Sequence, residues 1–266
     1  MSVIIVIPAR YASTRYPGKP LATLTGATGQ SLSLIERSWR AAMAVSGIDK
    51  VVVATDDERI SNAASAFGAD VVMTSSECRN GTERCADALA HLGKDFDIVV
   101  NLQGDAPLTP SWFVEDLIAG LRDNPDFDAA TPVLRADGAT LTSLKEDRQN
   151  GRVGGTTAVF DHDHRALYFS KEVIPFTSRD YLQDEPTPVF HHVGVYAYRP
   201  AALQTYLNLA PSNYEVHEGL EQLRFLESGH KMLCVEVEAR GRLFWELNNP
   251  EDIPKIETML RSMNLP

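Results

Sequence analysis

The stretch Val3-Ile4-Ile5-Val6-Ile7, followed by Pro8 and a polar loop, decides the fold class of this chain. A continuous β-branched run of this length is typical of a central strand in a parallel sheet, where both faces are buried. The run Ile98 to Leu102 has the same character. We therefore expect both runs to be buried strands of one mostly parallel sheet.

Strand and helix patterns alternate outward from this first run. The predicted strands are 3–7, 51–54, 71–73 and 98–102, and the predicted helices are 31–45, 58–67 and 82–92. This alternation predicts an α/β fold with a doubly wound, mostly parallel, Rossmann-like sheet, in which ligands bind beyond the carboxyl ends of the strands. From residue 129 the pattern changes to short strands, at 130–134, 157–160 and 192–198, which predict a smaller antiparallel excursion. Further helices are expected at 220–226 and 250–263.

Composition and charge narrow the function classes. The chain has 266 residues, 44% of them hydrophobic and 23% charged, which are ordinary values for a soluble globular enzyme. The formal net charge of −11 disfavours a nucleic-acid binder, because phosphate backbones are held mainly by excess Lys and Arg. A free nucleotide remains a possible ligand, since a few local cations suffice to bind it.

The cysteines and the N-terminus indicate the compartment. The 3 cysteines, Cys78, Cys85 and Cys234, form no CxxC pair, and an odd number of thiols cannot all pair within one chain. The apolar part of MSVIIVIPAR is far shorter than the roughly twenty residues that span a bilayer, and it follows no basic segment. We therefore expect a cytoplasmic protein with no membrane partner.

The loop PARYASTRYPGK, Pro8 to Lys19, follows the first strand directly. It places Arg10, Arg15 and Lys19 among the small residues Ser13, Thr14 and Gly18. Arg side chains grip phosphate oxygens in pairs, and small residues let the backbone approach a phosphate closely, so this loop suits a triphosphate. On charge alone a solvated basic loop explains it equally well. Neither GxxxxGK[ST] nor GxGxxG occurs, which disfavours a P-loop enzyme and an NAD-dependent oxidoreductase.

The segment NLQGDAP, Asn101 to Pro107, follows the second buried strand. An Asp at the end of such a strand can bind a metal ion that bridges phosphate oxygens and neutralises charge during phosphoryl-type transfer. Asp105 is therefore the candidate metal ligand. In isolation, an Asp shortly before a Pro is more often a simple turn former.

Taken together and in order, these motifs resemble those of the CMP-Kdo synthetases, which are 3-deoxy-manno-octulosonate (Kdo) cytidylyltransferases within the sugar nucleotidyltransferase group. The motifs are IPARYASTR-PGKPL (7–21), VATD (53–56), GTER (81–84), NLQGDAP (101–107), ALYFSK (166–171), HVGVYAYR (192–199) and LEQLR (220–224). NNPEDI (248–253) stands where the family has a segment similar to DTPEDL. The resemblance covers nearly the whole chain.

The resemblance implies transfer of CMP from CTP to a 2-keto sugar acid such as Kdo, with Mg²⁺ as cofactor, in lipopolysaccharide biosynthesis. It implies that the catalytic residues are Arg10, Arg15, Lys19 and Asp105. The implied CTP-binding residues are Ala9, Arg10, Ser13, Arg15, Lys19, Thr74, Ser75, Gly81, Thr82, Arg84 and Gln103. The implied acceptor-binding residues are Gln103, His192, Tyr196, Glu221 and Gln222, and the implied metal ligands are Asp105 and Asn248. For the acceptor residues, a half-core Tyr and a solvated Glu-Gln pair are ordinary alternatives.

The same resemblance assigns parts of the chain. We expect a single domain over residues 1–266, in which 1–128 is mainly the CTP-binding half. Residues 129–245 carry the acceptor and dimer contacts, and 246–266 form a C-terminal helix that packs back. The partners implied are CTP, an acidic sugar-like small molecule and a second copy of the chain in a homodimer.

Departures from the family pattern lie on the acceptor side. Asn248 replaces the usual second Asp, and a neutral oxygen binds a hard cation less strongly. Thr157 stands where a Lys is usual, Lys171 where an Arg is usual, and His191 replaces an Arg before His192. These changes leave open another acidic acceptor, such as 8-amino-Kdo, another ulosonic acid or a small phosphonate like phosphonoformate. They also leave open a non-catalytic nucleotide-binding homologue.

Overall fold

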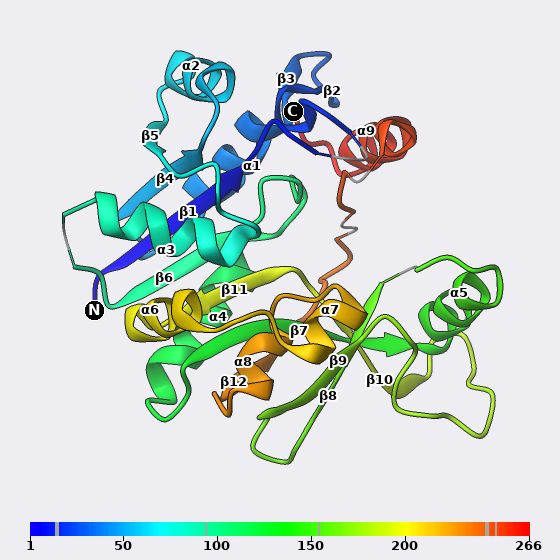
Figure 1. Ribbon diagram of the computed structural model, residues 1–266. Helices are drawn as coiled ribbons and strands as arrows, with labels where there is room; N and C mark the ends of the chain where they lie inside the picture. Colours follow the sequence, from blue (N-terminus) through cyan, green and yellow to red (C-terminus); the bar gives the residue numbers. More distant parts are fainter. Residues whose placement is uncertain (14–15, 94, 154, 243–244, 248) are drawn as a thin grey trace. The chain divides into compact units, whose positions relative to one another are not determined.

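The computed structural model describes residues 1–13, 16–93, 95–153, 155–242, 245–247 and 249–266 (Figure 1). The chain divides into two compact units. Unit 1 comprises Met1–Glu115, Tyr198–Leu203 and Ala239–Pro266, and unit 2 comprises Asp116–Ala197 and Gln204–Glu238. The helices α4 (Ser111–Asp123) and α6 (Pro200–Asn208) both cross from one unit into the other. Among the described residues, no helix has the length and apolar character needed to cross a membrane.

Unit 1 contains the parallel sheet predicted from the sequence. Its strands are β1 (Val3–Ala9), β4 (Lys50–Thr55), β5 (Asp70–Met73) and β6 (Ile98–Leu102). They pair in parallel in the order β5-β4-β1-β6. Residues 3–7 are fully buried, so the first apolar run is the central strand that its composition predicts.

Helices cover both faces of this sheet. Gly81 at the start of α3 (Gly81–His91) lies against Asn101, whose partner in the register of β1 and β6 is Val6. Ile35 of α1 (Leu34–Met43) lies with Ile7 beside Gly104. Val6 and Ile7 are consecutive and point to opposite faces, so α3 and α1 lie on opposite sides. This arrangement confirms the doubly wound fold.

The first predicted helix begins later than expected. Residues 31–33 form β3 (Ser31–Ser33), which pairs antiparallel with β2 (Thr23–Thr25). The Ser33 side chain accepts a hydrogen bond from the Glu36 backbone N–H, so this serine is the N-cap that ends the strand and starts α1. The helix α2 (Glu58–Ala66) begins in the same way after its N-cap Asp57. The predicted helix 31–45 therefore starts three residues too early, because residues 31–33 form a strand.

The C-terminal segment belongs to unit 1. The short 3-10 helices η1 (Lys19–Leu21) and η2 (Pro250–Asp252) and the helix α9 (Ile253–Ser262) lie in this unit. An apolar cluster joins α9 and its preceding segment to the first residues of α1 and β2: Leu24, Leu34, Leu108, Leu247, Ile256 and Leu260. The Arg37 side chain donates hydrogen bonds to the backbone carbonyls of Leu24 and Pro266. These contacts hold the end of the chain against the start of the fold.

Unit 2 contains the antiparallel strands. β7 (Ala129–Asp137), β10 (Pro186–His192), β8 (Thr156–Phe160) and β9 (Ala166–Ser170) pair antiparallel in that order. β12 (Met232–Glu236) pairs parallel with β7, and β11 (Val195–Tyr198) is the next strand beside β7. The predicted strand 192–198 is therefore two strands. The N–H of Val193 donates to the carbonyl of Pro132, and the N–H of Val195 donates to the carbonyl of Val193. These two hydrogen bonds turn the chain between β10 and β11.

Three helices complete unit 2: α5 (Gly138–Gln149), α7 (Asn213–Glu218) and α8 (Leu223–Glu227). α7 ends at Gly219, which has a φ of 62°, a left-handed conformation that glycine adopts without strain. Buried Arg224 donates hydrogen bonds to both carboxylate oxygens of Glu215, which links α8 to α7. The predicted helix 220–226 therefore begins three residues later, at Leu223.

Candidate active site

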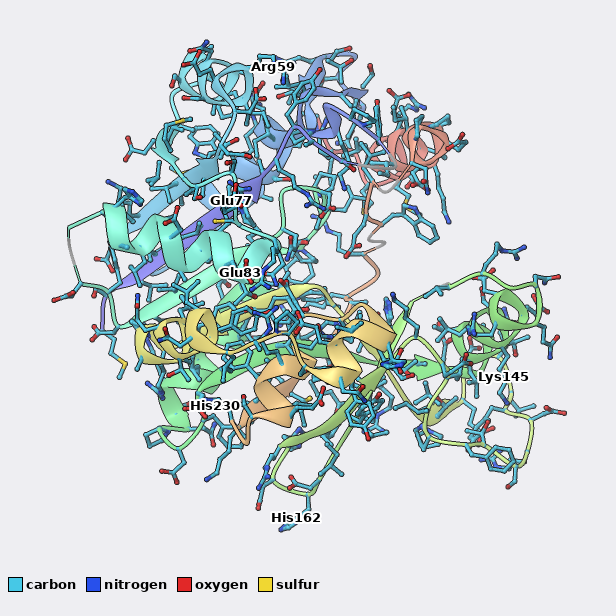
Figure 2. The ribbon with its side chains drawn as sticks, in the orientation of Figure 1. Arg59, Glu77, Glu83, Lys145, His162 and His230 are labelled. Carbon is cyan, nitrogen blue, oxygen red and sulfur yellow. The ribbon has the colours of Figure 1, made fainter. Side chains whose placement is uncertain are left out.

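The loop after β1 is closed by its own backbone. Gly18 has a φ of 70°, and its N–H donates to the carbonyl of Tyr11 at 2.9 Å. A side chain at this position would meet the Tyr11 ring, so glycine allows a close turn. The Arg59 guanidinium of α2 (labelled in Figure 2) lies 3.3 Å from the centroid of the same ring. Sequence reasoning did not include Arg59, because nothing in its local pattern points to this loop.

The predicted phosphate-binding residues lie along this loop. Ala9 is buried at the end of β1, Arg10 is exposed, and Ser13 accepts a hydrogen bond from Tyr16 N–H at 3.4 Å. Arg15 lies outside the described residues. Lys19 is the last residue of the loop, and its side chain is 15% exposed.

Lys19 and Asp105 form the central contact of the site. The Lys19 ammonium lies 2.6 Å from Oδ2 of Asp105, so the fold joins the loop after β1 to the loop after β6. The Asp105 side chain is 25% exposed and therefore accessible to a ligand. The carboxyl ends of adjacent parallel strands meet at one sheet edge, which is where ligands bind in this class of fold.

Backbone contacts fix the position of Asp105. The Ser38 hydroxyl donates to the carbonyl of Gly104 at 3.0 Å, and a side chain at Gly104 would collide with the carbonyl of Pro8. The N–H of Leu247 donates to the Asp105 carbonyl at 2.9 Å. Leu247 thus brings the C-terminal segment to the site. Asn248 lies outside the described residues.

A second group of predicted residues gathers at the start of α3. Arg84 is only 3% exposed; its Nη1 lies 2.6 Å from the Thr74 hydroxyl and 3.3 Å from Oδ1 of Asp56. Thr82 shares a hydrogen bond of 2.8 Å with the hydroxyl of Tyr198. These side chains hold the ends of β4 and β5 against α3. Exposed Ser75 donates its backbone N–H to Asp87.

Asn101 is a residue of this group that sequence reasoning missed. Gly81 packs closely against two amide side chains. A Cβ atom at this position would lie 3.0 Å from Nε2 of Gln103 and 3.1 Å from Nδ2 of Asn101. Asn101 is fully buried, and both polar atoms of its side chain lack a hydrogen-bond partner among the described residues. A buried amide without partners is costly. The signal in the sequence is an asparagine inside the apolar run of β6.

The predicted acceptor residues come together in unit 2. His192 is 6% exposed, and its ring lies 5.6 Å from that of Tyr196. The Tyr196 hydroxyl donates to Oε1 of Gln222 at 3.1 Å, while Nε2 of this buried Gln222 has no partner among the described residues. The carbonyl of Glu221 accepts a hydrogen bond from the Tyr206 hydroxyl at 3.3 Å. The described CTP-side residues all belong to unit 1, and these four acceptor-side residues all belong to unit 2.

Comparisons with known proteins identify the family of the chain. A family model described as cytidylyltransferase matches residues 4–232. The chain is 46% identical to the 3-deoxy-manno-octulosonate cytidylyltransferase of Maricaulis maris, over 98% of this chain and 97% of the relative. It is 39% identical to the mitochondrial enzyme of the same name from Arabidopsis thaliana, over 99% of this chain and 84% of the relative. The chain belongs to the 3-deoxy-manno-octulosonate cytidylyltransferase family.

Solved structures agree with this family. CMP:2-keto-3-deoxy-manno-octonic acid synthetase complexed with CTP has a TM-score of 0.82 and 33% identity, over 100% of both chains. A cytidylyltransferase from Leptospira borgpetersenii has a TM-score of 0.56 and 18% identity, over 93% of this chain and 82% of that one, and shares the fold alone. The chain is therefore a nucleotidyltransferase, and its fold is the one that other cytidylyltransferases share.

Two of the acceptor-side residues singled out in the sequence, Thr157 and Lys171, make contacts at the segment that follows β9. The Thr157 hydroxyl donates to the carbonyl of Glu172 at 2.6 Å and accepts from the N–H of Ile174 at 3.1 Å. This threonine is fully buried, and its two hydrogen bonds hold the loop after β9. The backbone N–H of Lys171 donates to Oε2 of Glu218 at 3.0 Å. Both contacts shape the segment that follows β9.

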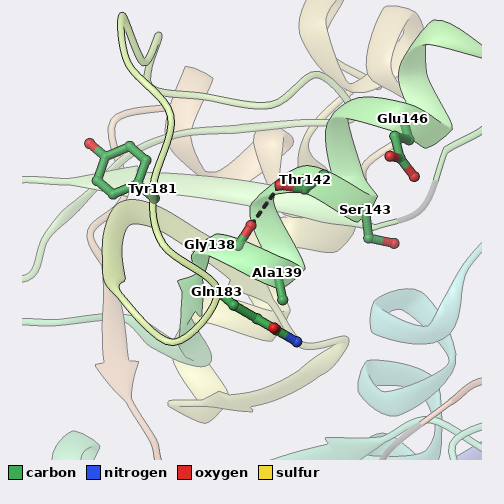
Figure 3. Close-up of a pocket in the computed structure, with 7 residues that line it drawn as sticks. All are labelled: Gly138, Ala139, Thr142, Ser143, Glu146, Tyr181 and Gln183. Atoms are coloured by element: carbon green, nitrogen blue, oxygen red, sulfur yellow. Dashed lines mark hydrogen bonds between the residues drawn. The ribbon is translucent and has the colours of Figure 1, made fainter.

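A hollow of about 350 Å³ opens elsewhere in unit 2, beside the start of α5 (Figure 3). Its lining residues are Gly138, Ala139, Thr142, Ser143, Glu146, Tyr181 and Gln183. The Thr142 hydroxyl donates to the carbonyl of Gly138 at 2.8 Å and so satisfies the helix rather than facing a ligand. None of the lining residues belongs to the predicted CTP or acceptor set.

Two adjacent histidines, His191 and His192, should make the stability of the fold decrease at acid pH. Burial lowers the pKa of His191 from 6.5 to about 4 and the pKa of His192 to about 3. As the pH falls below 6.5, the unfolded chain therefore takes up protons before the folded chain does, and the free energy of unfolding decreases. Each such ring costs about 1.4 kcal/mol per pH unit between its two pKa values.

We expect His191→Gln to weaken this dependence. Between pH 7.5 and pH 5, the free energy of unfolding of the wild type should fall by about 2 kcal/mol more than that of the variant. Urea unfolding at both pH values measures the difference. An identical decrease in both proteins would show that His191 titrates alike in the folded and unfolded chains.

Proposed function

We propose that this protein transfers CMP from CTP to Kdo and releases pyrophosphate. The observation that carries the proposal is the contact of 2.6 Å between Lys19 and Asp105, which joins the two loops at the carboxyl ends of β1 and β6. A cation and a metal-binding carboxylate placed together suit a triphosphate. The family of the chain and the CTP-bound relative support the choice of nucleotide.

The reaction is an in-line displacement at the α-phosphorus of CTP. The anomeric hydroxyl oxygen of the sugar acid forms a bond to this phosphorus, and the bond to the bridging oxygen of pyrophosphate breaks. The hydroxyl proton passes to solvent. Lys19, Arg10 and Arg15 bind the phosphates and stabilise the negative charge of the five-coordinate transition state, so positioning and electrostatics supply the rate.

Mg²⁺ is the proposed cofactor, and the described residues fit it. Asp105 offers a hard carboxylate oxygen that is partly exposed and lies beside the phosphate-binding lysine. Asp105 and Asn248 would hold the ion, which neutralises phosphate charge when bound. The neutral amide of Asn248 predicts weaker metal binding than a second carboxylate.

The remaining CTP-side residues are proposed to line the cytosine and ribose pockets. They are Ala9, Ser13, Thr74, Ser75, Gly81, Thr82, Arg84 and Gln103. The structure supports grouping them, because Thr74 with Arg84 and Gly81 with Gln103 lie in contact. Arg84 and Thr82 are already bonded within the fold, so we assign them to shaping the pocket.

The acceptor is proposed to bind against His192, Tyr196, Glu221 and Gln222 of unit 2. The unpaired Nε2 of buried Gln222 supports this, because it needs an acceptor oxygen such as a sugar carboxylate supplies. Gln103, which the family resemblance also assigns to the acceptor, belongs to unit 1. The departures at Thr157, Lys171 and His191 favour testing a second acidic acceptor beside Kdo. 8-Amino-Kdo, other ulosonic acids and phosphonoformate are the candidates.

We also propose a cytoplasmic homodimer. Large apolar side chains of unit 2 lie exposed, with Phe176 at 89% and Leu182 at 79%, which supports an interface on this unit. Light scattering measures the mass, and the mass of a single chain would contradict the dimer. Cys78, Cys85 and Cys234 form no disulfide bond with one another, which supports the proposal of a reducing compartment.

Pyrophosphate release tests the proposed reaction. We expect release with CTP, Mg²⁺ and Kdo, and a rate lower by about 10²-fold or more with ATP or GTP, because a pocket that hydrogen-bonds one base rejects others. A panel of 8-amino-Kdo, other ulosonic acids and phosphonoformate ranks the acceptors. Release with none of the sugar acids, in a folded protein, would contradict the proposal.

A further inference from the structure

His192 is held by a threonine that no motif singles out. Thr131 lies in β7, and His192 is the last residue of β10, which pairs with β7. The Thr131 hydroxyl lies 2.9 Å from Nε2 of His192. Thr131 is fully buried and His192 is 6% exposed, so solvent does not compete for this contact.

The same hydroxyl has a second partner that fixes the direction of the hydrogen bonds. Oγ1 of Thr131 lies 2.9 Å from the carbonyl of Val195 and 3.3 Å from the carbonyl of Val193. A carbonyl only accepts, and a hydroxyl has a single proton. The Val193 carbonyl already accepts from Val195 N–H at 2.7 Å, so the proton of Thr131 belongs on the Val195 carbonyl. The oxygen of Thr131 is then an acceptor, and Nε2 of His192 must donate to it.

We infer that Thr131 is a positioning residue that locks His192 in the neutral Nε2–H tautomer, so that Nδ1 is left to accept a hydrogen bond from an acceptor hydroxyl. The inference rests on the proposed function for the role of Nδ1 in substrate binding. The tautomer itself rests only on the geometry of unit 2.

The surroundings of the ring agree with a neutral histidine. The Phe169 ring meets it edge-on at 4.9 Å, and the Tyr196 ring lies 5.6 Å away. Burial, together with a smaller effect of neighbouring His191, lowers the pKa of His192 to about 3, so the ring carries no charge at neutral pH. A neutral imidazole has one donor and one acceptor nitrogen, and Thr131 uses the donor.

The side-chain amide of Gln222 offers a hydrogen-bond donor, whereas Nδ1 of His192 offers an acceptor. The Tyr196 hydroxyl donates to Oε1 of Gln222, which leaves the amide N–H₂ of Gln222 as a donor. Gln222 therefore suits an oxygen of a carboxylate, whereas Nδ1 of His192 suits a hydroxyl. A polyhydroxylated sugar acid presents both kinds of group. A phosphonate without hydroxyls presents only the first.

Nitrogen-15 NMR of histidine-labelled protein tests the tautomer without any substrate. In the wild type we expect the His192 ring to show a protonated Nε2 and an unprotonated Nδ1 at neutral pH. Thr131→Val keeps the shape but removes the oxygen, so the ring should change to a mixture of tautomers or to Nδ1–H. Thr131→Ser keeps the hydroxyl and should restore the wild-type signal. A wild-type Nδ1–H tautomer overturns the inference, even if Thr131→Val fails to fold.

Kinetics test the consequence for the acceptor. Thr131→Val should raise KM for Kdo about tenfold, the size of one lost hydrogen bond, with KM for CTP unchanged and Thr131→Ser close to wild type. A purely structural role would lower activity without the change in tautomer. If the wild type shows the Nε2–H signal but no cytidylyl transfer, the proposed function fails and the tautomer assignment stands. Equal KM values for Kdo in wild type and Thr131→Val overturn the role of Nδ1.

Discussion

Asp105→Asn is expected to lower kcat by about 10³-fold, because it removes the carboxylate charge beside the transferred phosphate. Asparagine keeps the size of the side chain and an oxygen that can accept from Lys19, and the backbone contacts of Gly104 and Asp105 that fix the loop are unchanged. The fold should therefore survive. Initial rates of pyrophosphate release at saturating Mg²⁺ and CTP measure the effect, and thermal unfolding checks the fold.

A matched control comes from a surface ion pair of the same unit. Asp70 lies at the start of β5, is 68% exposed and forms a 3.4 Å contact with Lys50. Asp70→Asn removes the same charge far from any predicted ligand contact and should leave kcat unchanged. If Asp105→Asn retains wild-type turnover at saturating Mg²⁺, Asp105 has no metal-binding or catalytic role.

Lys19→Met should have two effects of opposite sign. It should lower kcat by about 10²-fold, because a cation that stabilises the transferred phosphate is lost. It should also tighten Mg²⁺ binding to the protein without nucleotide, because the ammonium at 2.6 Å from Asp105 competes with the metal for the same carboxylate. Calorimetric titration with Mg²⁺ measures the affinity, and pyrophosphate release measures the rate.

Lys50→Met is the control for this second variant, since it breaks the surface pair with Asp70 and should change neither quantity. Mg²⁺ affinity that falls or stays the same in Lys19→Met would mean that the lysine does not compete for Asp105. Wild-type turnover in Lys19→Met would remove Lys19 from the phosphate-binding residues.

The parts of the fold that the sequence predicts best are its buried strands. The runs at β1 and β6 are apolar on both faces, so their composition identifies them without any knowledge of tertiary contacts. Residues 31–33 were assigned to a helix because their pairing with β2 is a contact between distant backbone groups, which leaves no periodic pattern. The same reason explains the turn between β10 and β11, which depends on a bond from Val193 to Pro132.

The sequence predicts which types of residue lie at the strand ends of the candidate site. It does not predict which of these residues contact one another. Both loops were expected at the carboxyl ends of buried strands, but the pairing of β1 with β6 was not predicted. The direct contact of Lys19 with Asp105 also depends on Gly18 and Gly104, which allow the close turns. Asn101 and Thr131 were missed because a single polar residue inside an apolar strand is ordinarily structural. In the structure, both polar side-chain atoms of Asn101 lack a hydrogen-bond partner among the described residues. The Thr131 hydroxyl contacts both His192 and the carbonyl of Val195.

Oxygen-18 labelling shows whether the anomeric hydroxyl of Kdo attacks the α-phosphorus of CTP. Kdo labelled with oxygen-18 at its anomeric hydroxyl is incubated with the protein, CTP and Mg²⁺, and the products are analysed by mass spectrometry. Attack by this hydroxyl on the α-phosphorus predicts CMP-Kdo that retains the label in the bond between sugar and phosphate, and pyrophosphate without it. Unlabelled CMP-Kdo from fully labelled Kdo, labelled pyrophosphate, or no CMP-Kdo at all would contradict the proposed in-line attack of this hydroxyl on CTP.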